Sequence, residues 1–220
     1  MNATILASGP TDASCRVLFI GDSWVSRNKL DQGVIDQLGE GTRVCSICLT
    51  GFTSKKILSA VRTTGLLAEA MRKMGGGPDF IVIVCGVNDA IAHRGAREYG
   101  RNVRRIAEAL RPSSSNIFAL ELPWISPAYR ARPFASRARN LAFKFLRDSG
   151  KDDVTLAYRR ALNAQSGQCF SVIPYDPFAP GYQPERFLDG VHIPMEETTK
   201  LGTYIASYIS RAARENGPSA

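Results

Sequence analysis

Short apolar runs alternate with segments of helical periodicity along most of the chain. The runs at 17–20, 43–49, 80–85, 116–122 and 169–173 are typical of buried strands. Between and after these runs, apolar residues at helical spacing predict helices. The predicted ranges are 24–38, 53 or 54 to 74 with a break at Gly65, 99–110, 158–164 and about 201–209. Strands that alternate with helices in this way predict a doubly wound α/β sandwich around a parallel sheet.

Residues that could take part in catalysis follow the predicted strands. Ser23 follows the first strand, Gly51 the second and Asn88 the third, while Asp189 and His192 lie in the loop after the fifth. Ligands of doubly wound sheets bind beyond the carboxyl ends of the strands. The sequence therefore predicts that these five residues share one edge of the sheet.

A serine needs a base before it can act as a nucleophile at neutral pH, and histidine is the usual one. The chain has two histidines. His192 lies in Asp189-Gly190-Val191-His192, a spacing that lets the carboxylate orient the imidazole. His93, next to Arg94, is interpreted as a solvated surface residue. Ser23 is the candidate nucleophile, although Gly-Asp-Ser is also an ordinary strand-ending turn and helix cap.

Ester cleavage also requires hydrogen-bond donors for the oxyanion that develops on the carbonyl oxygen. The candidates are the N–H of Ser23, the N–H of Gly51 and the side-chain amide of Asn88. Taken singly, Gly51 can equally be a turn glycine and Asn88 a loop cap.

Four blocks of sequence carry a resemblance to a known family. Gly21-Asp22-Ser23, Gly51 before a helix, Gly86-Val87-Asn88-Asp89 and Asp189-Gly190-Val191-His192 occur in the order and spacing of the SGNH, or GDSL-type, hydrolases. The resemblance spans almost the whole chain. It implies one domain over 1–220 with a flavodoxin-like, three-layer α/β/α sandwich and a five-stranded parallel sheet.

The resemblance also assigns roles to residues. Ser23 resembles the nucleophile, His192 the base and Asp189 the acid that orients the base, while Gly51 and Asn88 join the Ser23 N–H in the oxyanion hole. Asp22 is then a structural cap of the serine turn. The resemblance implies no metal and no cofactor.

Two features depart from the family pattern. Trp24 follows the serine where a smaller aliphatic residue is commoner, so it either walls the acyl site or packs inward; Trp24 and Trp124 are both predicted substrate contacts. Residues 126–154 form a predicted helical insertion near the mouth of the site, with seven basic residues against three acidic ones. A lid and a dimer surface are its two candidate roles.

Composition and charge narrow the range of partners and locations. The net charge of +8 favours anionic partners, but no nucleic-acid-binding motif accompanies the basic residues, so nucleic acid is not an expected partner. Arg97, Arg101, Arg104 and Arg105 are interpreted first as a solvated helix face and second as a means of recruiting anions.

No basic leader precedes the first strand and no apolar run could span a membrane, so a cytoplasmic location is expected. The C-x-x-C sequence 45–48 lies in a predicted strand without a nearby histidine, which favours core packing over a metal or redox role.

The function implied by the resemblance is hydrolysis of carboxylic esters through an acyl-enzyme. The preferred substrate is a small acyl group, such as acetyl, on a carbohydrate or a similar hydroxyl compound. The alternatives are a lysophospholipase or thioesterase acting on an anionic acyl substrate, an acyltransferase, and a binding module that holds an acylated ligand without turning it over.

Overall fold

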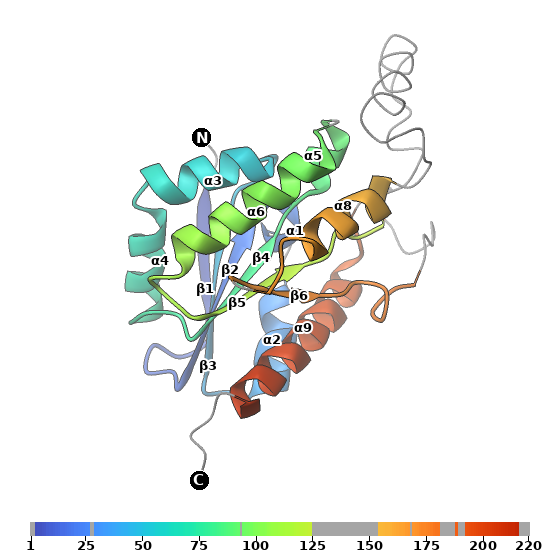
Figure 1. Cartoon of the computed structure of the whole chain (residues 1–220). Coiled ribbons are helices and arrows are strands. Elements are labelled where there is room, and N and C mark those ends of the chain that lie inside the picture. The colour runs from blue at the N-terminus through green and yellow to red at the C-terminus, as the bar shows by residue number, and fades with distance from the viewer. Residues whose placement is uncertain are drawn as a thin grey trace.

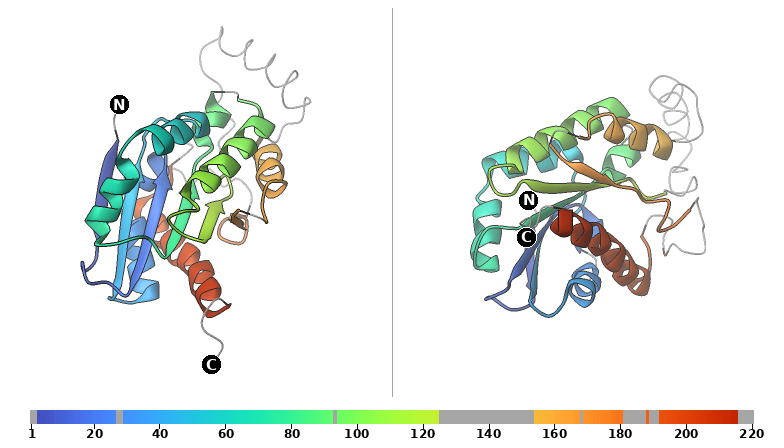
Figure 2. Two further views of the ribbon diagram at one scale, coloured as in Figure 1. Left: turned by 60° about the vertical axis from the view of Figure 1, so that its left-hand side comes forward. Right: turned by 60° about the horizontal axis from the view of Figure 1, so that its bottom comes forward.

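One six-stranded sheet with helices on both faces forms the protein (Figures 1 and 2). The computed structural model describes residues 3–26, 29–92, 94–124, 154–167, 169–180, 188 and 192–215. The strands lie in the order β1-β3-β2-β4-β5-β6. Their bounds are β1 Thr4–Ser8, β2 Cys15–Gly21, β3 Thr42–Cys48, β4 Phe80–Val84, β5 Asn116–Leu120 and β6 Ser171–Ile173.

Strands β2 to β6 are parallel, which confirms the predicted five-stranded parallel core. The chain moves outward from β2 to β3 and then returns across β2 to β4, so the direction of winding changes between β2 and β4. In sheets of this kind the crevice at that switch point is the usual place for a ligand. Ser23, directly after β2, lies at this point.

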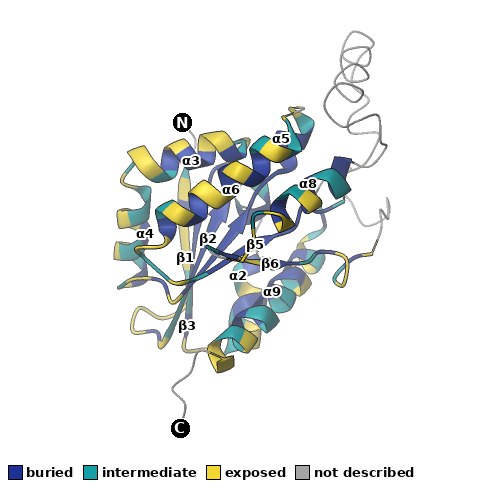
Figure 3. Cartoon of the chain, in the orientation of Figure 1, coloured by how far each residue is buried: buried dark blue, intermediate teal, exposed yellow. Residues whose placement is uncertain are grey.

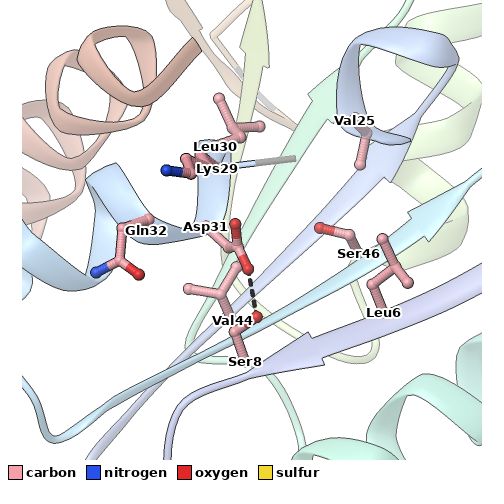
Figure 4. Close-up of a pocket in the computed structure, with 9 residues that line it drawn as sticks. All are labelled: Leu6, Ser8, Val25, Lys29, Leu30, Asp31, Gln32, Val44 and Ser46. Carbon is pink, nitrogen blue, oxygen red and sulfur yellow. Dashed lines mark hydrogen bonds between the residues drawn. The ribbon is translucent and has the colours of Figure 1, made fainter. Parts of the chain in front are cut away.

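The sixth strand, β1, was not predicted from the sequence. It pairs antiparallel with β3, from Thr4 opposite Cys48 to Ser8 opposite Val44. Only Ile5 of its five residues is buried, so it lacks the apolar pattern that marks the other strands. The Ser8 hydroxyl donates a hydrogen bond to Asp31 across a hollow of about 270 Å³ between this edge and α2 (Leu30–Leu38) (Figure 4).

Two layers of helices cover the sheet. The layer with α3 (Ser54–Thr63), α6 (Ala96–Leu110) and α8 (Val154–Asn163) lies on one face, and α2 with α9 (Met195–Glu215) lies on the other (Figures 1 and 2). Helix α4 (Leu66–Met74) packs against β3 and β1. Two short helices, α1 (Ser23–Ser26) and α5 (Val87–Ile91), begin just beyond β2 and β4.

The predicted helix over 24–38 is two helices in the structure. Helix α1 ends at Ser26 and α2 begins at Leu30, and Lys29 before it has a φ of 90°. A left-handed residue of this kind cannot continue a right-handed helix. Ser23 therefore starts a short helix of its own.

The core follows the predicted apolar stripes. All five residues of β4 are buried, and so are Tyr99, Val103, Ile106 and Leu110 on the inner side of α6 (Figure 3). Cys45 and Cys48 are buried free thiols in β3, as predicted for core packing. Because they are three residues apart in a strand, they point to opposite faces of the sheet.

The segment 126–153 lies outside the described residues, so the predicted helical insertion and its candidate roles stay predictions. Val154, which was counted as its last residue, is the first residue of α8, and this helix therefore starts four residues before the predicted position 158. None of the helices in the described part of the chain has the length and apolar character to cross a membrane.

Candidate active site

Ser23 and His192 come together although 169 positions separate them. Ser23 is the first residue of α1, directly beyond β2, and His192 lies three residues before α9. The distance between Ser23 Oγ and His192 Nε2 is 2.9 Å. At this distance the imidazole can take the hydroxyl proton. The distance meets the geometric requirement for a serine and a base that acts on it.

The turn that presents Ser23 is fixed on both sides. A Cβ at Gly21 would lie 2.0 Å from the Val84 carbonyl oxygen, so β2 can approach β4 this closely only with glycine there. The N–H of Asp22 donates to the same carbonyl at 3.1 Å. The Asp22 carboxylate accepts the N–H of Trp24 at 3.1 Å, which is the bond of a helix N-cap. The predicted capping role of Asp22 is confirmed.

Asp22 is a fully buried carboxyl group beneath the serine. Burial raises its pKa to about 7, although the Trp24 hydrogen bond acts in the opposite direction. Its Oδ2 atom and the Nδ2 atom of Asn88 are both buried without a hydrogen-bond partner among the described residues. The Asn88 amide faces the carboxyl group and lowers its pKa somewhat, but the two form no hydrogen bond of ordinary geometry.

The three predicted oxyanion donors are the N–H of Ser23, the N–H of Gly51 and Nδ2 of Asn88, and none of them forms a hydrogen bond of ordinary geometry with a described residue. Gly51 has a φ of 78° and is the third residue of a turn closed by the bond from Phe52 N–H to the Leu49 carbonyl. That conformation favours glycine. The turn and oxyanion-hole interpretations of Gly51 are therefore compatible.

Further bonds hold the Gly51 turn beside α1. The N–H of Leu49 donates to the Gly21 carbonyl at 2.8 Å, and the Thr50 hydroxyl lies 3.4 Å from that of Ser26. Since Gly21 immediately precedes the Asp22-Ser23 turn, these bonds place the Gly51 loop against the turn that presents Ser23.

A buried polar cluster, which was not predicted from the sequence, ties together the two donor loops, that is, the loop of Gly51 and the segment of Asn88. Asp89, next to Asn88, accepts the N–H of Ser54 at 2.7 Å and its hydroxyl at 2.6 Å, and Asn102 donates to the Ser54 hydroxyl at 3.1 Å. Ser54 lies three residues after Gly51. Burial raises the pKa of Asp89, while the two Ser54 hydrogen bonds oppose that rise. The cluster thus fixes the Gly51 loop relative to the start of α5.

The two tryptophans predicted to contact substrate have different surroundings. Trp24 is 4% exposed and packs edge-on against Tyr175, so it follows the inward-packing alternative. Trp124 is partly exposed beyond β5; its indole N–H donates to Asp176 at 2.8 Å, and the Arg159 guanidinium lies 4.6 Å from its ring. A substrate contact by Trp124 stays a prediction.

Arg159 organises this second cluster and was not singled out from the sequence. It is buried, donates to the Leu122 carbonyl at 2.8 Å and pairs with Asp176 at 2.6 Å. These contacts join α8 to the chain leaving β5 and β6. The arginine lies in a helix with ordinary amphipathic spacing, so only the tertiary structure reveals its burial.

Asp189, the predicted acid of the site, and His93, predicted to be a solvated surface residue, lie outside the described residues. The N–H of Leu188 donates to the His192 carbonyl at 2.7 Å, which brings the two ends of the segment 188–192 together. The role of Asp189 therefore stays a prediction. Within the described ranges, no three His, Cys, Asp or Glu side chains gather in the manner of metal ligands.

Comparison of the sequence with family models and with curated proteins gives no match. Solved structures do resemble this one. TesA aligns with a TM-score of 0.61 at 19% identity, over 89% of this chain and 98% of TesA. A GDSL-like lipase from Bacteroides thetaiotaomicron gives 0.54 at 21%, over 90% and 88%, and Axe2, an acetylxylan esterase from Geobacillus stearothermophilus, gives 0.56 at 15%, over 90% and 95%. The chain has the fold of these proteins, which confirms the fold implied by the sequence resemblance.

Proposed function

We propose that the protein is a serine hydrolase that cleaves carboxylic esters through an acyl-enzyme. The supporting observation is the 2.9 Å distance between Ser23 Oγ and His192 Nε2, together with three predicted oxyanion donors that form no ordinary hydrogen bond with a described residue. A nucleophile, a base and oxyanion donors are the parts that acyl transfer requires. The fold shared with GDSL-like lipases and esterases agrees with this chemistry.

The first half of the reaction acylates the serine. His192 Nε2 takes the proton of Ser23 Oγ as that oxygen attacks the ester carbonyl carbon. The negative oxygen of the tetrahedral intermediate accepts hydrogen bonds from the Ser23 N–H, the Gly51 N–H and the Asn88 amide. When the intermediate collapses, the proton on His192 passes to the leaving alcohol.

The second half releases the acid. Water attacks the acyl carbon with His192 as its base, and the proton returns to Ser23 Oγ as the second intermediate breaks down. Asp189 is the proposed acid that holds the imidazole in the required tautomer. Each intermediate uses the same donors, so a single site serves both steps.

We propose a small acyl group on a carbohydrate as the preferred substrate. Among proteins of this fold, Axe2 is described as an acetylxylan esterase. Another protein of this fold is described as a GDSL-like lipase, so a substrate with a longer acyl group is the alternative. A series of p-nitrophenyl esters from acetyl to dodecanoyl separates the two: kcat/KM falls with chain length for the preferred substrate and rises for a lipase or thioesterase.

The function is tested by p-nitrophenyl acetate hydrolysis with wild type and Ser23→Ala. Wild type is expected to turn over and the variant to lose essentially all activity. A control is Ser59→Ala, at an exposed serine of α3. Turnover by Ser23→Ala at the wild-type rate would contradict the mechanism, and an inert wild type would favour the binding module. Transfer of acetyl to an added alcohol in preference to water would favour the acyltransferase.

A further inference from the structure

Helix α6 carries a stripe of arginines on its exposed side, defined here as Arg97, Arg101 and Arg105. All three residues are exposed. They recur every four residues, so they fall on one face and span about 12 Å along the helix axis. The buried residues Tyr99 and Ile106 lie on the opposite face.

The stripe arginines form no ion pairs within the described structure. The neighbouring Arg104 is paired with Glu108 at 2.8 Å, whereas the three stripe arginines form no ion pair or hydrogen bond with a described residue. Like charges four residues apart destabilise a helix. Helix stability therefore does not account for this arrangement.

The whole helix layer around the stripe shares its charge. The exposed basic residues of α3, α6 and α8 are Lys55, Lys56, Arg62, Arg97, Arg101, Arg104, Arg105 and Arg160, and the acidic residues of these helices are Glu98 and Glu108. On the opposite face, α2 and α9 carry five acidic residues (Asp31, Asp36, Glu196, Glu197 and Glu215) and three basic ones (Lys200, Arg211 and Arg214). Among these five helices, the surplus of positive charge therefore lies on one face of the sheet.

A hollow beside the stripe is large enough for part of a ligand. Its volume is about 310 Å³, and Arg101, Arg104, Arg105, Glu108 and Gln165 line it. Gln165 follows the end of α8, so the hollow lies where α6 and α8 pack together. A guanidinium binds carboxylate, sulfate or phosphate groups through paired hydrogen bonds, and glutamine can bond to hydroxyl groups.

The stripe begins at the edge of the sheet that carries the candidate active site. Helix α6 starts at Ala96, five residues after α5 ends at Ile91, and it runs away from that edge (Figure 1). Asn102, between the stripe arginines, donates to Ser54 in the cluster that ties the two donor loops together. Lys56 lies 5.8 Å from the ring of Phe52, the residue after Gly51, and adds a cation at the site edge.

The surroundings of the stripe favour one class of polyanion. The large exposed apolar residues of the described chain are Leu6, Leu188 and Met195, none of them on α3, α6 or α8, so this face offers no apolar anchor for a lipid bilayer. The tyrosines of α6 and α8, Tyr99 and Tyr158, are fully buried and cannot stack on nucleic-acid bases. An acidic polysaccharide requires neither feature.

We propose that the α6 arginine stripe binds a carboxylated polysaccharide and holds its ester groups near Ser23. This inference rests on the proposed ester hydrolysis and adds the charge of the substrate. A polyanionic chain with charges every few ångströms can contact successive arginines of the stripe and the hollow beside them. The interaction is largely electrostatic, so salt weakens it.

The test compares two acetylated cellulose derivatives, carboxymethylcellulose with charges and hydroxyethylcellulose without them. Wild type is compared with the triple variant Arg97→Gln, Arg101→Gln, Arg105→Gln and with a control of equal charge change on the opposite face, Lys200→Gln, Arg211→Gln, Arg214→Gln. The stripe variant is expected to lose about tenfold in kcat/KM on the charged polymer only. In 0.5 M salt, kcat/KM of wild type on the charged polymer should fall to the same level. The control variant should keep the wild-type kcat/KM on both polymers.

Three results would overturn the stripe proposal. The first is an unchanged rate of the stripe variant on the charged polymer, and the second is an equal loss on both polymers. The third is tighter binding of single-stranded DNA or of anionic lipid vesicles than of carboxymethylcellulose.

Hydrolysis of p-nitrophenyl acetate tests the proposed function separately, because this small neutral ester needs no stripe. If it is not hydrolysed, the proposed function fails, and direct binding of unacetylated carboxymethylcellulose to wild type and to the stripe variant still decides whether the stripe binds polyanions.

Discussion

The two sides of Ser23 are built in different ways. On the base side, one 2.9 Å hydrogen bond joins the start of α1 to His192, a residue 169 positions away. On the oxyanion side, the loops after β3 and β4 flank β2 and are tied together through Asp89 and Ser54. One pair of side chains carries the proposed proton transfer, whereas several donors share the proposed oxyanion. Damage to the base side should therefore cost more activity than damage to any one donor.

The largest effect is expected for His192→Ala. Without the base, Ser23 keeps its proton and attack on the ester becomes slow, so kcat should fall by roughly 10⁴-fold or more. Steady-state hydrolysis of p-nitrophenyl acetate measures this loss. His93→Ala, at the only other histidine, is the control and should keep wild-type activity. A His192→Ala enzyme within tenfold of wild type would show that another group is the base.

A smaller loss is expected for Asn88→Ala on the oxyanion side. Removing one donor from an oxyanion hole costs roughly 10²- to 10³-fold in kcat, since the other donors remain. Asn163→Ala, which removes an amide of α8 that donates to Glu121 at 2.7 Å, is a control for loss of an amide hydrogen bond and should leave kcat largely unchanged. Equal activity of the two variants would remove Asn88 from the oxyanion hole.

Ser54→Ala tests the bond between the two donor loops. The variant removes one of the two hydrogen bonds that the buried Asp89 carboxylate accepts, so unfolding free energy should fall by about 1–3 kcal/mol. The donors should also lose alignment, with kcat lower by about tenfold. Urea unfolding and ester hydrolysis give the two values. Ser59→Ala, an exposed residue of the same helix, should alter neither, and identical behaviour of the two variants would mean that the cluster does not position the donors.

The smallest effect on rate, below tenfold, is expected for Asp22→Asn, because asparagine can still cap α1. Its effect on stability depends on pH. Burial raises the pKa of Asp22 from 3.8 to about 7, so between these values the folded protein binds a proton that the unfolded chain does not. Wild-type stability from this group therefore falls as pH rises from 4 to 7, by at most about 4 kcal/mol at 1.36 kcal/mol for each pKa unit.

Urea unfolding at pH 5 and pH 8 measures this difference. Asp22→Asn should lose less stability than wild type between the two pH values, since asparagine does not titrate. Asp36→Asn, at an exposed carboxylate of α2, should follow wild type. A pH dependence of Asp22→Asn equal to that of wild type would show that Asp22 is ionised throughout this range.

Periodicity was enough to predict most of the fold because the strands and helices have strong apolar patterns. Strand β4 is apolar throughout, and α6 repeats its buried residues every three or four positions. The pattern fails for β1, an edge strand with one buried residue, and for the helix over 24–38, which Lys29 interrupts. In both places a local conformation or pairing decides the structure, and neither has a periodic signal.

The candidate site shows a similar division. Ser23, Gly51, Asn88 and His192 could be predicted from their places after strands, because parallel strands end at one edge of the sheet. The Asp89 to Ser54 bonds and the buried Arg159 cluster could not, since each depends on which helices become neighbours. A polar residue near a helix start gives no information about its partner 35 positions away.

Labelling with a fluorophosphonate probe tests the central claim most directly, because such probes bond covalently to an activated serine. The modified residue is located by mass spectrometry after digestion, in wild type and in Ser23→Ala. The expected result is one adduct, on Ser23, that abolishes ester hydrolysis and is absent from the variant. An adduct on a different residue, or full hydrolysis by a protein that the probe does not modify, would contradict Ser23 as the nucleophile.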